Sequence, residues 1–174
     1  MRNGRQADER NGGGGVSRPA EGSQDVSDRV PASAAWLGGA GLLPFFGLAA
    51  AHWAVESGLL PMPLTFRTGP ALASYAALIL SFMGGCRWGF ESIRAAPEPT
   101  AKKLVVSVVP ALYAWVALLF DVPMACAALA LGFSLLLAAD LALAQEGGAP
   151  RWWPRLRWPL TLGAVLSLLL GAMA

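Results

Sequence analysis

The sequence is poor in the side chains that carry most enzyme chemistry. It has a single histidine, His52, and two cysteines, Cys86 and Cys126. Two cysteines are too few for a disulfide framework, and no Cys/His spacing resembles a zinc site. The chain contains neither a G-x-S-x-G elbow nor a G-x-x-x-x-G-K-[ST] phosphate loop. We therefore predict no catalytic residue, no metal ligand and no cofactor.

Charge is also scarce along the 174 residues. Charged residues make up 14% of the chain, whereas a soluble domain usually carries about 25%. Hydrophobic residues make up 55%, and the mean hydropathy is +0.50. The formal net charge of +2 is too small to indicate a nucleic-acid partner. This composition is typical of an integral membrane protein whose immediate partner is the lipid bilayer.

The first 31 residues differ from the rest because they are polar and rich in glycine. Five arginines are balanced by five acidic residues there. Such a segment buries too little apolar area to offset its ordering entropy, so residues 1–31 are predicted to be disordered. No secretory signal is expected, and Asp8 and Glu9 argue against a mitochondrial transit peptide. One folded domain, residues 32–174, is predicted to follow.

Within that domain, five apolar stretches approach the roughly 20 residues that a membrane-spanning helix needs. A soluble helical bundle would show a polar residue every three or four positions. The stretches "LVVSVVPALYAWVALLF" and "PLTLGAVLSLLLGAMA" show no such stripe. The predicted fold is an all-α bundle of five transmembrane helices, at about 34–55, 70–90, 104–120, 123–144 and 158–174.

The basic residues predict an orientation for these spans. Twelve of the thirteen lysines and arginines fall in or beside the N-terminal tail, the second loop and the fourth loop, and only Arg67 falls on the other side. Loops rich in lysine and arginine stay in the cytoplasm. The N-terminus is therefore expected to be cytoplasmic and the C-terminus to lie outside.

Tryptophans mark the expected membrane interfaces. Trp36 and Trp53 are 17 residues apart, about 26 Å of helix, which suits anchors at both ends of the first span. Asp121 is expected to cap the fourth span, with Pro123 in its first turn. The remaining anchors are expected at the cytoplasmic interface: Trp88, Trp152, Trp153 and Trp158.

The stretch "SFMGGCRWGFESIR" combines small residues with charge. Ser81, Gly85 and Gly89 recur every four residues, and Gly84 widens the groove between them. Such a small-xxx-small ridge lets another helix approach closely. We interpret it as a packing seam. It is also the candidate contact face for a membrane-protein partner or a second copy of the chain.

The charged half of this stretch lies at the predicted cytoplasmic boundary. Arg87, Glu91 and Arg94 share one helix face by their spacing. The favoured interpretation is a helix leaving the membrane, with snorkelling side chains and local ion pairs.

Four further segments occur in a characteristic order: "GLLPF" at 41–45, "SYAALILSFMGGCRWGF" at 74–90, "SVVPAL" at 107–112 and "PRWWPRLRWPLT" at 150–161. Together they resemble a family of small bacterial inner-membrane proteins, domain of unknown function 3429, to which mitochondrial transmembrane protein 69 is related. The resemblance covers the chain from Trp36 onward. It implies a multi-pass protein of the inner membrane and supplies no established activity. It adds weight to these architectural positions: Pro44, Gly84, Gly85, Trp88, Gly89 and Pro110.

Asp140, in "LLLAADLALA", is the best candidate for a functional polar residue. It lies about one helical turn inside the cytoplasmic end of its span, where an unpaired carboxylate is costly. Arg87, Arg155 and Arg157 are its candidate partners. A structural ion pair is the favoured role; proton or solute handling and simple solvent exposure are the alternatives.

For the other polar residues and the helix prolines, a structural role is the favoured interpretation. His52 and Glu56, four residues apart, form either an interfacial anchor or a proton-coupled device. Pro44 and Pro110 are candidate helix kinks, which in some transporters mark the site. The two cysteines fall near opposite membrane faces, too far apart for a disulfide, and are expected to fill space.

The favoured function is a non-enzymatic assembly, accessory or structural protein that acts through helix packing. The alternative is a small transporter or channel built around Asp140 and Arg87. An intramembrane enzyme comes third, because no nucleophile–base pair is visible.

Overall fold

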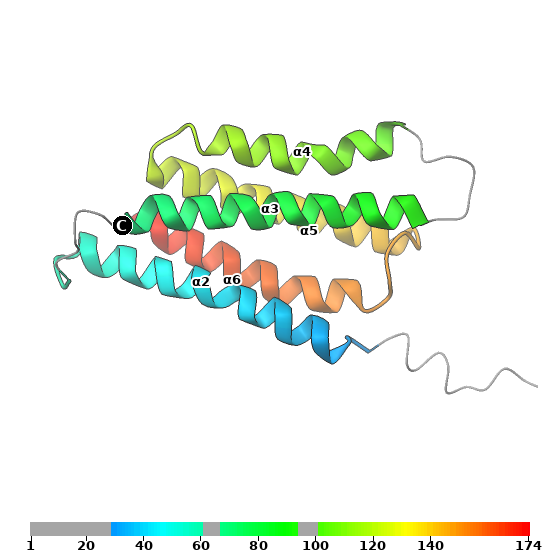
Figure 1. Ribbon diagram of the computed structural model, residues 1–174, viewed down its shortest axis with the longest axis horizontal. Helices are drawn as coiled ribbons and strands as arrows, with labels where there is room; N and C mark the ends of the chain where they lie inside the picture. Colours follow the sequence, from blue (N-terminus) through cyan, green and yellow to red (C-terminus); the bar gives the residue numbers. More distant parts are fainter. Residues whose placement is uncertain (1–28, 61–66, 94–100) are drawn as a thin grey trace, which may run out of the picture.

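The computed structural model describes residues 29–60, 67–93 and 101–174, and this part of the chain consists of α-helices joined by turns, without a strand (Figure 1). Most of the predicted disordered tail, and Arg94, lie outside these residues. The helices are α2 (Ala32–Glu56), α3 (Thr68–Ile93), α4 (Ala101–Ala117), α5 (Val122–Gln145) and α6 (Trp153–Met173).

Four helices, α2, α3, α5 and α6, are long and apolar enough to cross a membrane. The fifth, α4, has 17 residues and is the shortest. The prediction of an all-helical, multi-pass membrane protein is therefore confirmed. Each helix lies on one of the five predicted stretches.

The helix ends differ from the predicted bounds by one to five residues, and two of these differences have a clear physical reason. The third stretch was expected to reach residue 120, but α4 ends at Ala117 because the chain tightens into a turn. There the Leu119 amide donates to the Val116 carbonyl oxygen at 3.0 Å. The last helix begins at Trp153 rather than 158, because Pro154 fits the first turn, where no backbone donor is needed.

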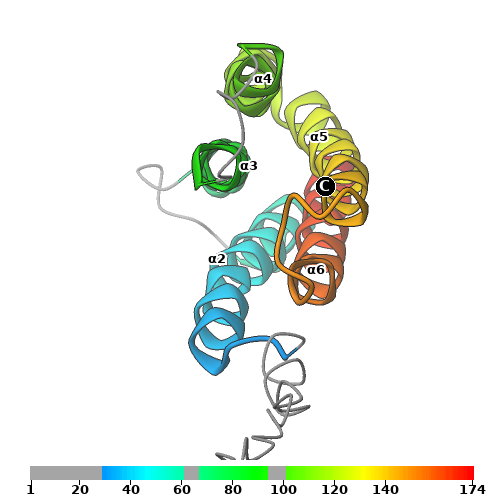
Figure 2. The same cartoon turned by 90° about the vertical axis from the view of Figure 1, so that its right-hand side faces the viewer.

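Helix α3 packs against all four of the other helices and leaves one side open (Figure 2). In the end-on view α2, α6, α5 and α4 follow one another around it (Figure 2). Helix α4 packs on α3 and α5 within the described part of the chain. Successive helices run in opposite directions, so α2 and α6 begin at the same end of the bundle (Figure 1).

The core is built from aromatic rings and very small residues. Phe45 packs edge-on against Tyr75 and Phe133, with ring centroids 5.1 and 5.9 Å apart. A Cβ atom added to Gly132 on α5 would lie 2.7 Å from the Tyr113 ring on α4. Glycine therefore allows the close helix approach that is typical of membrane bundles.

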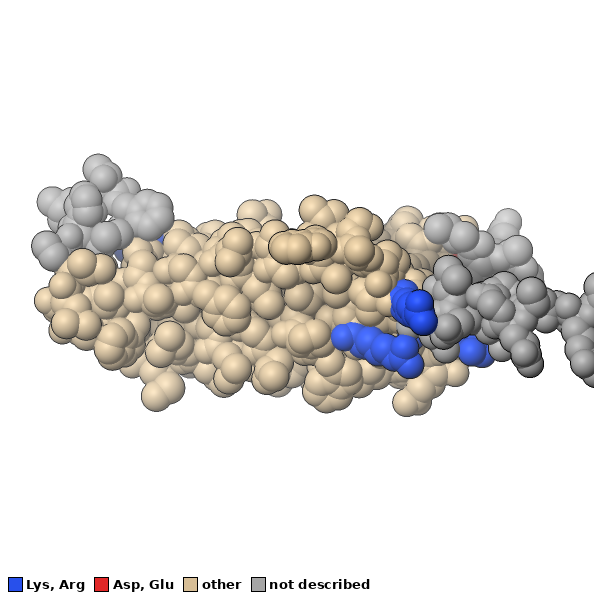
Figure 3. Space-filling model, turned by 90° about the horizontal axis from the view of Figure 1, so that it is seen from below, with Lys and Arg blue, Asp and Glu red and all other residues tan. Residues whose placement is uncertain are grey.

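The outer surface is apolar. Large side chains such as Leu78, Trp115 and Leu119 are each more than 60% exposed, at 68%, 62% and 67%. Figure 3 shows a long uncharged surface, with the most prominent basic side chains at the end where α2 and α6 begin. A belt of this kind suits lipid chains around the bundle and head groups at its basic end.

Candidate functional site

The structure brings Arg87, Asp140 and Arg157 together inside the bundle. Asp140 on α5 is 1% exposed. Arg87 on α3 donates from Nη1 to its Oδ1 at 2.9 Å, and Arg157 on α6 donates from Nε to its Oδ2 at 2.8 Å. Both carboxylate oxygens are thus held by guanidinium groups from two other helices. The predicted ion pair is confirmed, and it joins three helices rather than two.

This ion-pair cluster (Arg87, Asp140 and Arg157) lies near one end of the bundle. Asp140 is five residues before the end of α5, and Arg157 is four residues after the start of α6. The snorkelling interpretation of Arg87 is wrong, because its side chain is only 12% exposed and turns inward to Asp140. The buried Asp140 carboxylate attracts the Arg87 guanidinium more strongly than an exposed carboxylate would, because charges interact more strongly in a low-dielectric interior. Glu91 is also buried, at 8% exposed.

Arg157 has further partners. Its Nη1 donates to the Met83 sulfur on α3 at 2.8 Å. Its Cζ lies 5.9 Å from the centre of the Trp153 ring, within range of a cation–π contact. Sequence reasoning missed Met83, because a methionine in an apolar run carries no signal of this contact.

Trp153 is not an interfacial anchor as predicted. It is 7% exposed, and its ring packs edge-on against Phe90 and Trp152, with centroid distances of 4.9 and 5.8 Å. Trp153 is the first residue of α6 and lies four positions before Arg157. Because residues four apart share a helix face, both side chains point into the bundle.

Three buried polar atoms on α6 have no hydrogen-bond partner among the described residues: Trp153 Nε1, Arg157 Nη2 and Thr161 Oγ1. They recur every four residues, so they follow one stripe of the helix. All three residues line a pocket of about 320 Å³ between α2, α3 and α6. Thr161 was missed, although its spacing from Arg157 places it on the same face.

The predicted ridge on α3 points away from the other helices. A Cβ added to Gly85 or Gly89 would meet no atom within 4 Å, whereas one added to Gly84 would lie 2.7 Å from the Ser107 carbonyl oxygen. Ser81 is partly buried, and its hydroxyl donates to the Ala77 carbonyl oxygen at 2.8 Å. Within the bundle the close approach to α4 therefore runs through Gly84, and the predicted seam of Ser81, Gly85 and Gly89 is open at its two glycines. Their role toward a partner stays a prediction.

A second ridge, on α6, was missed. Gly163, Ser167 and Gly171 show the same four-residue spacing and are all buried. A Cβ on Gly163 would lie 2.9 Å from the Leu42 side chain of α2, and Gly171 faces Leu72 of α3. The signal was present in "GAVLSLLLG", so the same spacing rule would have found it.

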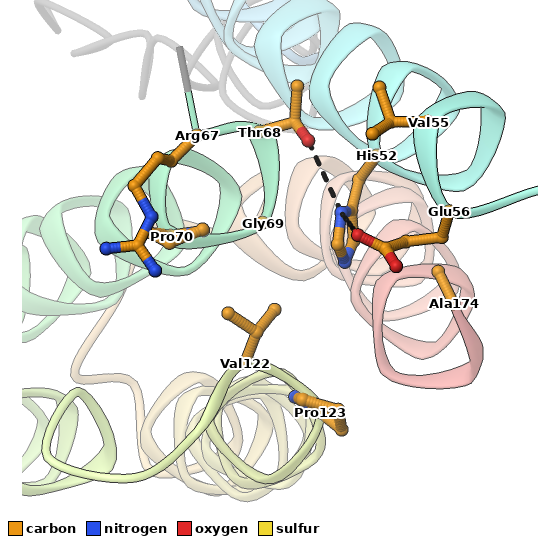
Figure 4. Close-up of a pocket in the computed structure, with 10 residues that line it drawn as sticks. All are labelled: His52, Val55, Glu56, Arg67, Thr68, Gly69, Pro70, Val122, Pro123 and Ala174. Atoms are coloured by element: carbon orange, nitrogen blue, oxygen red, sulfur yellow. Dashed lines mark hydrogen bonds and ion pairs between the residues drawn. The ribbon is translucent and has the colours of Figure 1, made fainter. Parts of the chain in front are cut away.

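The predicted pair of His52 and Glu56 lies at the opposite end of the bundle. His52 Nδ1 is 3.9 Å from Glu56 Oε1 and 3.3 Å from Thr68 Oγ1 on α3. Figure 4 shows these side chains at the edge of a pocket of about 420 Å³, with Arg67 across from them. His52, Glu56 and Arg67 all line this pocket. The sequence did not indicate that Arg67 and Thr68 would lie beside the predicted pair.

The other predicted tryptophan anchors are mostly exposed, and their position at a membrane interface stays a prediction. Trp36 and Trp53 lie near the two ends of α2 and are 80% and 47% exposed. Trp88 and Trp158 are also exposed, and Trp152 is partly buried.

The remaining predicted positions are the two helix prolines, Asp121 and the cysteines. Pro44 and Pro110 lie inside α2 and α4 without ending either helix. Asp121 occupies the N-cap position of α5 but makes no side-chain cap hydrogen bond, so its predicted capping role is wrong. Both cysteines are free; Cys126 is fully buried and Cys86 partly so.

Comparison with known proteins identifies relatives. The sequence profile of a family described as protein of unknown function (DUF3429) matches residues 30–173. Transmembrane protein 69 of Xenopus tropicalis is 40% identical over 146 residues, which cover 80% of this chain and 53% of that protein. Transmembrane protein 69 of Mus musculus is 33% identical over 144 residues, which cover 79% of this chain and 54% of that protein.

The chain therefore spans about half the length of the curated relatives it matches. No solved structure matches it. The family match covers every described helix and confirms the resemblance seen in the sequence motifs. The chain belongs to the DUF3429 family of proteins of unknown function.

Proposed function

We propose that this protein is a non-enzymatic accessory protein of the bacterial inner membrane, which helps another membrane protein to assemble or persist. The observation that carries this proposal is the pairing of the Asp140 carboxylate with two arginines. Both of its oxygens accept hydrogen bonds from arginines of neighbouring helices. These hydrogen bonds connect α3, α5 and α6. They favour a structural role for Asp140 over a catalytic one.

A contact face for the partner is the outward ridge of Ser81, Gly85 and Gly89. Space around both glycines is open in the single chain. Small residues let a second helix approach closely enough for extensive backbone contact, which drives helix association in lipid. A different membrane protein or a second copy of this chain would fit the same face.

Ridge variants test the partner. The chain is crosslinked in intact membranes and purified in mild detergent, and co-purifying proteins are identified by mass spectrometry. We expect a stoichiometric partner with the natural chain and at least tenfold less with Gly85→Ile/Gly89→Ile, because the added side chains keep the second helix away. Gly47→Ile is the matched control, since Gly47 on α2 is equally open. Equal recovery from all three proteins would contradict the proposal.

We also propose that α4 crosses the membrane, with the N-terminus cytoplasmic. Its 17 residues span about 26 Å, close to the roughly 30 Å hydrocarbon core. The alternating directions of the helices and the basic end of the bundle support this arrangement (Figures 1 and 3).

Reporter fusions test this topology. Alkaline phosphatase, which is active only outside, is expected to be active after Ala174 and within residues 118–121. It is expected to be inactive after Gly148, which connects α5 to α6. Activity confined to a cytoplasmic reporter at position 174 would make the five-span arrangement wrong.

A small transporter or channel is the second candidate. It is favoured by the two arginines of the cluster, which open onto different pockets: Arg87 onto those beside α4, and Arg157 onto the one between α2, α3 and α6. Asp140 joins them. Solute flux in proteoliposomes that is lost in a folded Asp140 variant would support transport over the accessory function.

A further inference from the structure

The buried polar atoms without a partner on α6 indicate a binding site, and this inference does not depend on the accessory function. Trp153, Arg157 and Thr161 are 7%, 2% and 3% exposed, yet Nε1, Nη2 and Oγ1 have no partner in the described chain. Buried polar atoms in native proteins nearly always have a partner. Nε1 and Nη2 are donors only, and the hydroxyl can also donate. The stripe therefore offers hydrogen bonds to an acceptor outside the described chain.

The pocket beside this stripe has an apolar body. Its volume of about 320 Å³ lies at the lower end of the range for ligand sites, about 300–1,000 Å³. Its other walls include Leu42, Phe45 and Ile79. Leu37 of α2 and Phe82 of α3 also line it and are 75% and 63% exposed. The pocket thus opens sideways between α2 and α3, toward the lipid chains.

The polar part of the pocket is positive. Among the described residues that line it, Arg157 is the one charged residue. Its counter-ion Asp140 is shared with Arg87, so the charge of this carboxylate is divided between two guanidinium groups. Glu91 lines a separate pocket on the far side of Arg87, between α3, α4 and α5. A negative group would therefore be favoured beside Arg157 rather than a positive one.

We propose that this pocket binds an anionic amphiphile, a molecule with an oxyanion head and one apolar chain in the pocket. The head oxygens, of a carboxylate or a phosphate, accept hydrogen bonds from Arg157 Nη2, Trp153 Nε1 and the Thr161 hydroxyl. Arginine forms its strongest hydrogen bonds with such oxyanions. The chain lies along the apolar wall toward Phe45 and Ala164, deeper in the bundle. The source is either a free fatty acid or a membrane phospholipid.

Native mass spectrometry of the whole protein in a neutral detergent tests this. The probes are oleate, phosphatidylglycerol and oleyl alcohol, which has the chain of oleate without its charge. We expect saturable binding of at least one anionic probe, at least tenfold tighter than that of the alcohol. Preference for oleate identifies a free acid, and preference for phosphatidylglycerol identifies a lipid.

The decisive variant is Trp153→Phe/Thr161→Val, which removes two unpartnered groups and leaves the ion-pair cluster in place. We expect it to remain folded and to bind the preferred probe at least tenfold more weakly, with a lower melting temperature that reflects only the packing lost against Phe90 and Trp152. Trp158→Phe, on the same helix but exposed, is the control and should bind normally. Undiminished binding by the double variant, equal binding of the alcohol, or no binding of any probe would overturn the proposal.

Discussion

Replacing Asp140 by asparagine is expected to lower the free energy of unfolding by about 3–5 kcal/mol, the range seen when one partner of a buried ion pair is removed. Asparagine keeps the shape of the side chain but offers one acceptor oxygen and a donor amide. The amide would face a guanidinium donor from Arg87 or Arg157, which are now 2.9 and 2.8 Å from the two carboxylate oxygens. The buried Arg157 guanidinium and the partly buried Arg87 guanidinium would both lose the carboxylate that they now share.

Unfolding in mixed micelles with sodium dodecyl sulfate, followed by circular dichroism, measures this change. Asp121→Asn is the matched control, because Asp121 is exposed and makes no side-chain cap hydrogen bond. An exposed substitution of this kind is expected to change stability by no more than about 0.5 kcal/mol. If Asp140→Asn behaved like the control, the cluster would contribute little to holding the three helices.

The second large effect is expected at Gly84. Gly84→Leu is predicted to destabilise the protein by about 3 kcal/mol, the upper part of the usual range for overpacking. A Cβ there would lie 2.7 Å from the Ser107 carbonyl oxygen and 3.2 Å from the Pro110 ring. Because the nearest atom belongs to the backbone of α4, a rotamer change cannot relieve the clash, and α4 must move away from α3.

The adjacent glycine supplies the control for this prediction. Gly85→Leu should leave the unfolding free energy within about 0.5 kcal/mol of the natural chain, because its added side chain meets no atom within 4 Å. The same micelle titration compares the two variants. Equal destabilisation by both, or by neither, would contradict the placement of α4 against Gly84.

The fold was predictable because lipid imposes simple rules. A helix that crosses the membrane must be long and apolar, and the five stretches in the sequence satisfied that rule well enough to locate every described helix. Asp140 was predictable for the same reason, since a carboxylate inside such a stretch needs a partner. Arg157 is one of the three candidate partners that the sequence indicates for Asp140.

What could not be predicted is which face of a helix meets which neighbour. Successive residues of a helix point about 100° apart, so adjacent Gly84 and Gly85 face opposite environments although both look alike in sequence. Trp153 was placed at the interface because tryptophan usually lies there. Its burial follows from its phase relative to Arg157, which becomes known only when α5 and α6 are packed together.

In the proposed accessory function, the charges of the ion-pair cluster hold the helices together and do nothing else for the partner complex. Replacing all three residues by apolar ones, Arg87→Met/Asp140→Leu/Arg157→Met, tests this most directly, because well-packed apolar substitutes for a buried ion-pair group commonly preserve a fold. The measurement is recovery of the stoichiometric partner from crosslinked membranes. We predict recovery equal to that of the natural chain. A triple variant that folds normally but loses its partner would show that the charges themselves carry the function.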